Sequence, residues 1–139
     1  MSTGSTIAIQ NKDNTVTGIY CHSDGYVSSV GRTLFENYTH EDRVRELIAL
    51  GSLSILGTEI GSKHNFDVRD NRSWCKAYGR DRGESNQEAD TWDSYQQLIN
   101  ESSQDYNYLF TPGQGWTVTR YVQNTNNVAD LLDEFPEEY

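Results

Sequence analysis

The chain has 139 residues, the size of one ordinary domain, with 35% hydrophobic residues and a formal net charge of −10. Residues 1–82 hold ten acidic and ten basic residues, whereas residues 83–139 hold eleven acidic residues and a single basic one, Arg120. Such a one-sided field argues against direct nucleic-acid binding and favours basic protein surfaces as partners. No stretch approaches the roughly 18–20 apolar residues of a membrane span, and no secretion signal is apparent, so we expect a soluble intracellular domain.

The first predicted element is a β-hairpin. Residues 5–11 alternate apolar and polar side chains, residues 15–22 are rich in β-forming types, and the turn-forming run 12–14 separates them. Apolar residues then recur at helical spacing, which predicts a helix that begins near Ser28 or Ser29 and a second helix after Thr39.

Two further segments follow that second helix. Gly51 is expected to end it in a left-handed conformation. Leu53, Leu56 and Ile60 then predict a short third helix, and a polar loop over 63–72 leads to a predicted strand at 73–78.

The second half of the chain predicts a helix over about 87–102 and a second hairpin. Residues 106–111 and 116–122 are the two strands, and the Pro-Gly-Gln-Gly run between them is a strong turn signal. Apolar residues from Val128 to Phe135 give a short final helical face. We therefore expect a single α+β domain over 1–139, with an antiparallel sheet of two hairpins and a middle strand and with helices packed on one face.

The segment 20–26 concentrates residue types that carry chemistry. Cys21 and His22 point to opposite faces of the expected strand, so they do not form a local nucleophile–base pair. The simplest interpretation is a buried Cys21, a His22 at a polar edge, and a turn at Asp24-Gly25.

A zinc site is the metal hypothesis for the same residues. Cys21, His22, His64 and Cys75 lack the spacing of zinc-binding sequences, so we expect neither a metal nor another cofactor. Both thiols are then expected to be small buried residues in a reducing cytosol.

A second segment, 78–84, holds two arginines that would share one face of a strand. Arg80 and Arg82 would then form a clamp for a phosphate or carboxylate. The alternative is an internal ion-pair network with Asp81, Glu84 or a helix carboxylate. In the clamp hypothesis, a nucleotide base would stack on a nearby ring, with Tyr20, Tyr26 and Trp74 as the candidates.

The acidic half divides into two parts. Glu88, Asp90 and Asp93 fall in the first turns of the helix expected at 87–102, where the helix dipole favours acids. The C-terminal segment 124–139 has no such explanation. Its acids are either a solvated surface or a docking surface for a basic partner, and they are Asp130, Asp133, Glu134, Glu137 and Glu138.

Four runs of sequence resemble a family of small accessory proteins of tailed phages and prophages. The runs are 5–11 (STIAIQN), 18–26 (GIYCHSDGY), 44–51 (VRELIALG) and 78–84 (YGRDRGE). The resemblance covers about residues 1–84, and the hairpin near 106–118 more loosely. It implies a phage origin and the host cytoplasm, and it carries over no catalytic residues.

Charge and resemblance together favour a non-catalytic counter-defence or host-takeover protein. It would bind and inhibit a host protein through its acidic surface, with mimicry of nucleic-acid charge as one means. A nucleotide-sequestering protein, a metal-assisted hydrolase and a virion component are the alternatives. The hydrolase would use Asp24, Asp81 or Glu84, and self-association into a homo-oligomer stays open.

Overall fold

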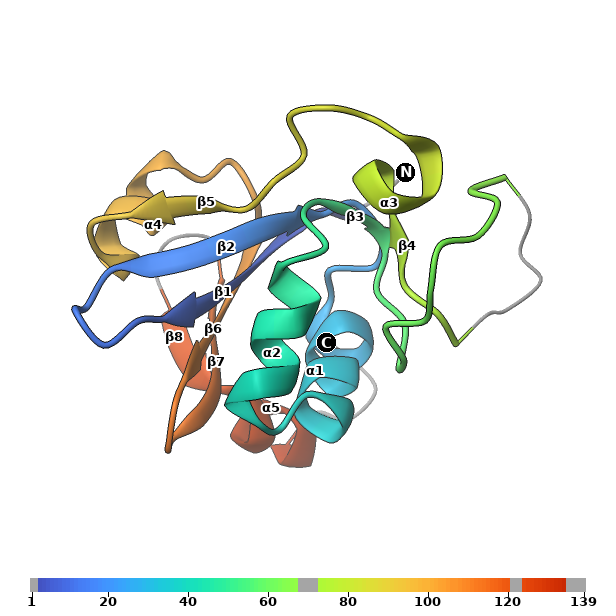
Figure 1. Ribbon diagram of the computed structural model, residues 1–139. Coiled ribbons are helices and arrows are strands. Elements are labelled where there is room, and N and C mark those ends of the chain that lie inside the picture. The colour runs from blue at the N-terminus through green and yellow to red at the C-terminus, as the bar shows by residue number, and fades with distance from the viewer. Residues whose placement is uncertain (1–2, 68–72, 121–123, 135–139) are drawn as a thin grey trace.

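The computed structural model describes residues 3–67, 73–120 and 124–134 (Figure 1). A mixed sheet forms the centre, with helices on both of its faces. In chain order the elements are β1 (Ser5–Gln10), β2 (Val16–Cys21), the π-helix η1 (Val27–Gly31), α1 (Arg32–Asn37), α2 (Glu41–Ile48), β3 (Leu53–Ile55), β4 (Lys76–Ala77), α3 (Tyr78–Arg82), β5 (Asp90–Trp92), α4 (Tyr95–Glu101), β6 (Tyr106–Thr111), β7 (Gly115–Arg120), β8 (Asn124–Asn127) and α5 (Val128–Glu134).

The strand order is β4-β3-β2-β1-β6-β7-β8, with β5 paired to β2 beside that path. The expected α+β class is confirmed, but the sheet is mixed rather than wholly antiparallel. β1 runs parallel to β6, and β2 runs parallel to β3. Parallel neighbours need a long crossover connection, and the chain between β1 and β6 supplies one that includes helices α1 to α4.

Both hairpins are confirmed. β1 and β2 pair antiparallel from Ser5 opposite Cys21 to Gln10 opposite Val16. β6 and β7 pair from Tyr106 opposite Arg120 to Thr111 opposite Gly115. The first turn places Asn14 at a positive φ of 70°, a conformation that Asn tolerates better than most residues.

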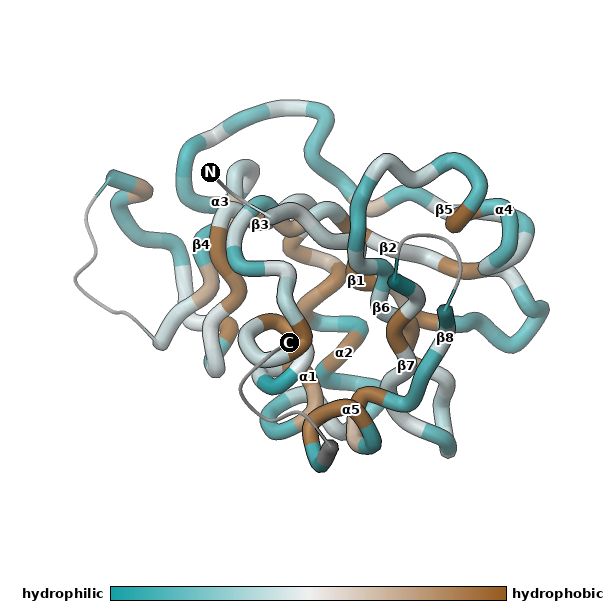
Figure 2. Tube along the Cα trace, turned by 180° about the vertical axis from the view of Figure 1, so that it is seen from behind, coloured by the Kyte–Doolittle hydropathy of each residue, from teal (hydrophilic) through white to brown (hydrophobic). Residues whose placement is uncertain are grey.

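The two faces of the sheet bury different apolar sets. Side chains such as Ile7, Ile19 and Tyr108 pack under η1, α1, α2 and α5 in the main core. The opposite face holds a smaller cluster in which Leu98 of α4 covers Ala8, with Trp92 and Tyr95 packed alongside. Helices therefore cover both faces, not one face as expected. Figure 1 shows α4 and β5 separated from the group of α1, α2 and α5 by the sheet, and Figure 2 shows hydrophobic residues concentrated in the central strands.

The helix expected after Thr39 is confirmed as α2, and Gly51 follows it with a φ of +78°. The third helix expected over 53–60 is wrong, because Leu53 belongs to β3. Its backbone carbonyl accepts the N–H of His22 at 2.9 Å, so pairing with β2 takes precedence over the helical spacing of three apolar residues.

Two other boundaries differ from expectation. The strand expected at 73–78 is only Lys76–Ala77, after which Tyr78–Arg82 turns into α3. The helix expected over 87–102 is limited to Tyr95–Glu101, because 90–92 pairs with β2 as β5. No helix within the described ranges is long and apolar enough to cross a membrane.

Candidate functional site

A cleft of about 250 Å³ opens on the sheet face that α4 covers only in part. We call it the acidic cleft. Strands β1 and β2 form its floor, β5 and the loop before it form one side, and α4 with the segment after it forms the other. Its lining residues are Thr6, Gly18, Ile19, Tyr20, Ser52, Glu88, Asp90, Trp92, Leu98, Glu101, Ser102, Ser103 and Gln104.

Three carboxylates reach this cleft from three separate elements. Glu88 lies in the loop that joins α3 to β5. The N–H of Ser52, just before β3, donates to the carbonyl of Gln87 at 2.8 Å and so holds this loop in place. Asp90 begins β5, opposite Gly18 of β2. Glu101 is the last residue of α4. The loop before β5, β5 itself and the end of α4 therefore each contribute one carboxylate to the same opening.

None of these three carboxylates forms an ion pair with any residue that the structure describes. The described ion pairs instead use Glu36, Glu41, Asp81 and Glu84. Among the described residues that line the cleft there is no Lys, Arg or His. No ion pair of the described chain therefore offsets its negative charge, although Arg80, which is paired with Asp81, lines a neighbouring cavity together with Glu88.

Glu101 stands where a helix disfavours it. The carbonyl end of a helix carries partial negative charge, so a carboxylate in the last turn is repelled. The dipole explanation expected for Glu88 and Asp90 is wrong as well, because the first turn of α4 holds no acid and begins only at Tyr95. Helix chemistry therefore does not account for the acids of the cleft.

Two aromatic side chains complete the lining. Trp92 is half-buried and packs against the smaller core cluster. Tyr20 shares a hydrogen bond of 2.8 Å between its hydroxyl and Nδ1 of His22. Burial raises the pKa of Tyr20, so this ring stays neutral at physiological pH. Carboxylates beside aromatic rings form a surface that attracts organic cations such as guanidinium and ammonium groups.

The strand geometry expected for Arg80 and Arg82 is wrong, because both lie on α3. Arg80 donates to the carboxylate of Asp81 and to the carbonyls of Ile60 and Cys75 at 2.9 and 2.8 Å. Arg82 pairs with Glu84 and stacks 4.4 Å from the ring centroid of Phe66. The internal ion-pair network is therefore what the structure contains, and the two guanidiniums have separate partners.

The aromatic candidates for the nucleotide hypothesis are dispersed. Tyr20 lines the acidic cleft, whereas Trp74 packs edge-on to His64 with ring centroids 5.6 Å apart. Tyr26 is 43% exposed, accepts a hydrogen bond from Thr3 and lies edge-on to Tyr106. A nucleotide-binding role for these residues stays a prediction.

The segment 20–26 adopts the simplest geometry expected for it. Cys21 is buried, His22 is exposed, and Asp24 has a φ of +56° at the turn. The Tyr108 hydroxyl donates to the Gly25 carbonyl at 2.7 Å, which ties this turn to the core. Burial raises the pKa of the Cys21 thiol to about 12, so no nucleophilic thiolate is available there.

No group of His, Cys, Asp and Glu within the described ranges is arranged to hold a metal ion. Two of the acids considered for a hydrolase are already paired, Asp81 with Arg80 and Glu84 with Arg82. The zinc and hydrolase hypotheses therefore gain no geometric support from this part of the chain.

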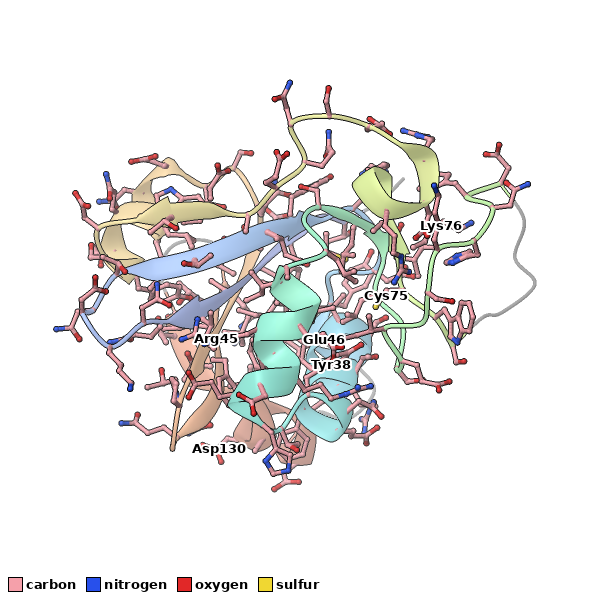
Figure 3. All side chains as sticks on the ribbon, viewed as in Figure 1. Tyr38, Arg45, Glu46, Cys75, Lys76 and Asp130 are labelled. Carbon is pink, nitrogen blue, oxygen red and sulfur yellow. The ribbon has the colours of Figure 1, made fainter. Side chains whose placement is uncertain are left out.

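The C-terminal acids are only partly described. Asp130 and Asp133 are exposed on α5, and Figure 3 shows Asp130 beside the group of α1, α2 and α5, away from β5 and α4. Glu134 is the last residue of α5, while Glu137 and Glu138 lie outside the described residues. The acidic half of the chain thus forms two separate surfaces.

Sequence reasoning missed Glu88, Asp90 and Glu101 as a site. The available signal was the absence of any Lys or Arg between Arg82 and Arg120, over a stretch that contains six acids. Comparison with models of known protein families, with curated proteins and with solved structures gave no match.

Proposed function

We propose that this protein is a non-catalytic binding protein that docks onto a basic surface of a partner protein through the acidic cleft. One observation carries the proposal: Glu88, Asp90 and Glu101 converge from three elements on one aromatic cleft without a cationic partner in the described chain. A lysine or arginine side chain of a partner supplies the missing charge, and the rings of Trp92 and Tyr20 line the same cleft, where a cation can contact them.

The size of the cleft supports a side chain rather than a cofactor as its occupant. Its volume of about 250 Å³ is below the roughly 300–1,000 Å³ of small-molecule sites. Following the family resemblance, we propose a host protein in the host cytoplasm as the partner, with inhibition as the outcome. A nucleic-acid-binding surface on that partner fits best, because such surfaces carry the basic charge that the cleft attracts.

Affinity capture from a bacterial lysate tests the proposal. The bait is the intact protein, compared with a cleft variant that carries Glu88→Gln, Asp90→Asn and Glu101→Gln. A matched control loses three exposed acids elsewhere, through Asp24→Asn, Asp42→Asn and Glu46→Gln. We expect the parent protein and the control variant to capture a partner with a basic surface, and the cleft variant to fail to capture it. High salt should reduce the yield of the captured partner.

Equal capture by the cleft variant and the control would contradict the role of the cleft. A further variant with Asp130→Asn and Asp133→Asn separates the α5 acids from the cleft acids. If only that variant loses the partner, docking uses α5 and the proposed site is wrong.

A further inference from the structure

A second concavity lies where α1, α5 and the β6–β7 hairpin meet. Figure 1 shows α1 and α5 on the other side of the sheet from β5 and α4, which border the acidic cleft. We call it the apolar pocket. Its volume is about 170 Å³, and no charged side chain of the described residues lines it. The lining residues are Phe35, Thr39, Phe110, Gln114, Gly115, Trp116, Asn127 and Ala129.

The inner wall of the apolar pocket is rigid. Phe110 and Trp116 are buried and pack edge-on with ring centroids 5.2 Å apart. The Trp116 indole N–H donates to the carbonyl of Tyr38, the C-cap residue of α1, at 2.8 Å. This hydrogen bond fixes the ring relative to the C-terminal end of the helix. A pocket built from locked aromatic side chains keeps its shape without a ligand, as binding hot spots do.

The outer wall exposes an aromatic ring to solvent. Phe35 is 42% exposed, and among the described residues only Tyr26 is a comparably exposed large hydrophobic side chain. Phe35 of α1 and Thr39, which lies just beyond the end of that helix, both line the pocket. Because Phe35 lines the same pocket as Phe110 and Trp116, a side chain that enters the pocket contacts aromatic rings on both walls.

α5 carries two acidic residues close in sequence to Ala129, the residue by which this helix lines the pocket. Asp133 lies one helical turn from Ala129 on the exposed side of α5, and Asp130 is exposed next to Ala129. Figure 3 shows Asp130 at this end of the molecule. No Lys or Arg is among the described lining residues, so the two α5 acids favour a cationic group beside the side chain that fills the pocket.

We infer that the apolar pocket binds a partner polypeptide segment that carries one bulky apolar side chain flanked by lysine or arginine. The volume admits one side chain and is too small for a typical small-molecule ligand. The apolar side chain fills the space between Phe35 and Trp116, and the flanking cation faces Asp130 and Asp133. This inference does not rest on the acidic cleft, and the two surfaces can be tested separately.

The three tryptophans of the chain make a direct experiment available. Trp116 lines the apolar pocket, Trp92 lines the acidic cleft, and Trp74 lies in neither. Each indole N–H gives its own signal in a two-dimensional nitrogen–proton NMR spectrum of the full chain. The probe is the peptide acetyl-Gly-Lys-Phe-Lys-Gly amide, and a control peptide has Ala in place of Phe.

We expect saturable shifts of the Trp116 indole and of the Gly115 and Ala129 amides with the Phe peptide, and none with the Ala peptide. Phe35→Ala is expected to weaken binding by about tenfold, as for the loss of one anchoring contact. Tyr26→Ala removes an equally exposed ring elsewhere and is expected to leave binding unchanged. Should Phe35→Ala fail to fold, Asp133→Lys serves as the second variant, with weaker binding expected.

Three results would overturn the inference. Equal shifts with the Ala peptide mean that no apolar anchor is used. A shift of Trp92 in place of Trp116 means that the peptide follows charge into the acidic cleft, which leaves the proposed function standing. Shifts of Trp116 that grow with protein concentration alone mean that a second copy of the chain fills the pocket.

Discussion

The Arg80 guanidinium holds the carboxylate of its own chain neighbour, Asp81, with Nε 3.0 Å from Oδ1 and Nη2 3.1 Å from Oδ2. The Asp81 side chain is fully buried and also accepts the N–H groups of Ala77 and His64. This carboxylate therefore joins α3, β4 and the loop that precedes residue 68. The pair is a structural unit of the fold, and the arginine it uses is not free to clamp a ligand.

Replacing Asp81 with Asn is expected to destabilise the fold by about 3 kcal/mol, because it leaves the Arg80 charge without its partner. Urea unfolding at neutral pH measures this loss. Arg45→Gln is the matched control, since its pair with Glu41 is exposed and is worth at most about 1 kcal/mol. Equal losses in the two variants would contradict the structural role of Asp81.

The contribution of Asp81 is also expected to depend on pH. Burial alone would raise the pKa of Asp81, but the hydrogen bonds from Arg80, Ala77 and His64 outweigh it and lower the pKa below 3.8. A carboxyl with a lowered folded pKa stabilises the fold above its unfolded pKa and loses that contribution as pH falls through the folded value. The stability gap between the parent and Asp81→Asn should therefore be full at pH 6 and shrink below about pH 4. A gap that stays constant down to pH 2 would contradict this.

Gly51 is expected to be essential for the wall of the acidic cleft. Its φ is +78°, and an added Cβ would collide with the backbone carbonyl of Gln87, next to Glu88. Gly51→Ala is expected to cost about 2–4 kcal/mol through strain and overpacking. Gly83→Ala is the control, because it has a similar φ of +73° but open space around it, so about 1 kcal/mol is expected. Thermal unfolding of both variants measures the difference, and equal costs would contradict the close packing at Gly51.

The two ends of α4 are expected to respond oppositely to loss of charge. Glu101→Gln removes a carboxylate from the carbonyl end of the helix and should stabilise the protein by about 0.3–1 kcal/mol. Asp93→Asn removes one just before the N-cap Ser94 and should destabilise it slightly. Denaturant midpoints of both variants give the signs. A destabilised Glu101→Gln would show that Glu101 has a structural role instead of one in binding.

The two thiols are expected to be inert in the native protein. Cys21 and Cys75 are fully buried, and desolvation raises the pKa of both. Reaction of the native protein with a disulfide reagent at pH 8 should therefore be slow and should follow the rate of unfolding. In denaturant, both thiols should react rapidly. Rapid reaction of either thiol in the native state would contradict this burial.

Local sequence patterns predicted the elements that local contacts determine. Both hairpins and α2 with Gly51 have their turn or end signal within a few residues, and α5 follows from the short apolar face that begins at Val128. The misassigned elements depend on distant partners. Leu53 forms part of β3 because it pairs with Cys21 of β2. Residues Asp90–Trp92 form β5 because they also pair with β2. Helical spacing over a few apolar residues does not reveal such pairing.

The same difference explains the candidate site. The acidic half was evident from composition, and its preference for basic partners follows from charge alone. Which acids act together depends on the tertiary fold, because Glu88, Asp90 and Glu101 meet only when β5 and α4 cover the sheet. A helix over 87–102 would also place Glu88 and Asp90 in its first turns. There the helix dipole alone would explain them, so the sequence did not indicate that they belong to a site.

Titration of the isotope-labelled protein with a tri-arginine peptide, followed on the three indole signals, tests the central claim most directly. We predict a saturable shift of the Trp92 indole that weakens in high salt. The shift should disappear in the variant with Glu88→Gln, Asp90→Asn and Glu101→Gln, and persist in the control with Asp24→Asn, Asp42→Asn and Glu46→Gln. A Trp92 signal that does not move, or that moves equally in both variants, would contradict the acidic cleft as the docking site.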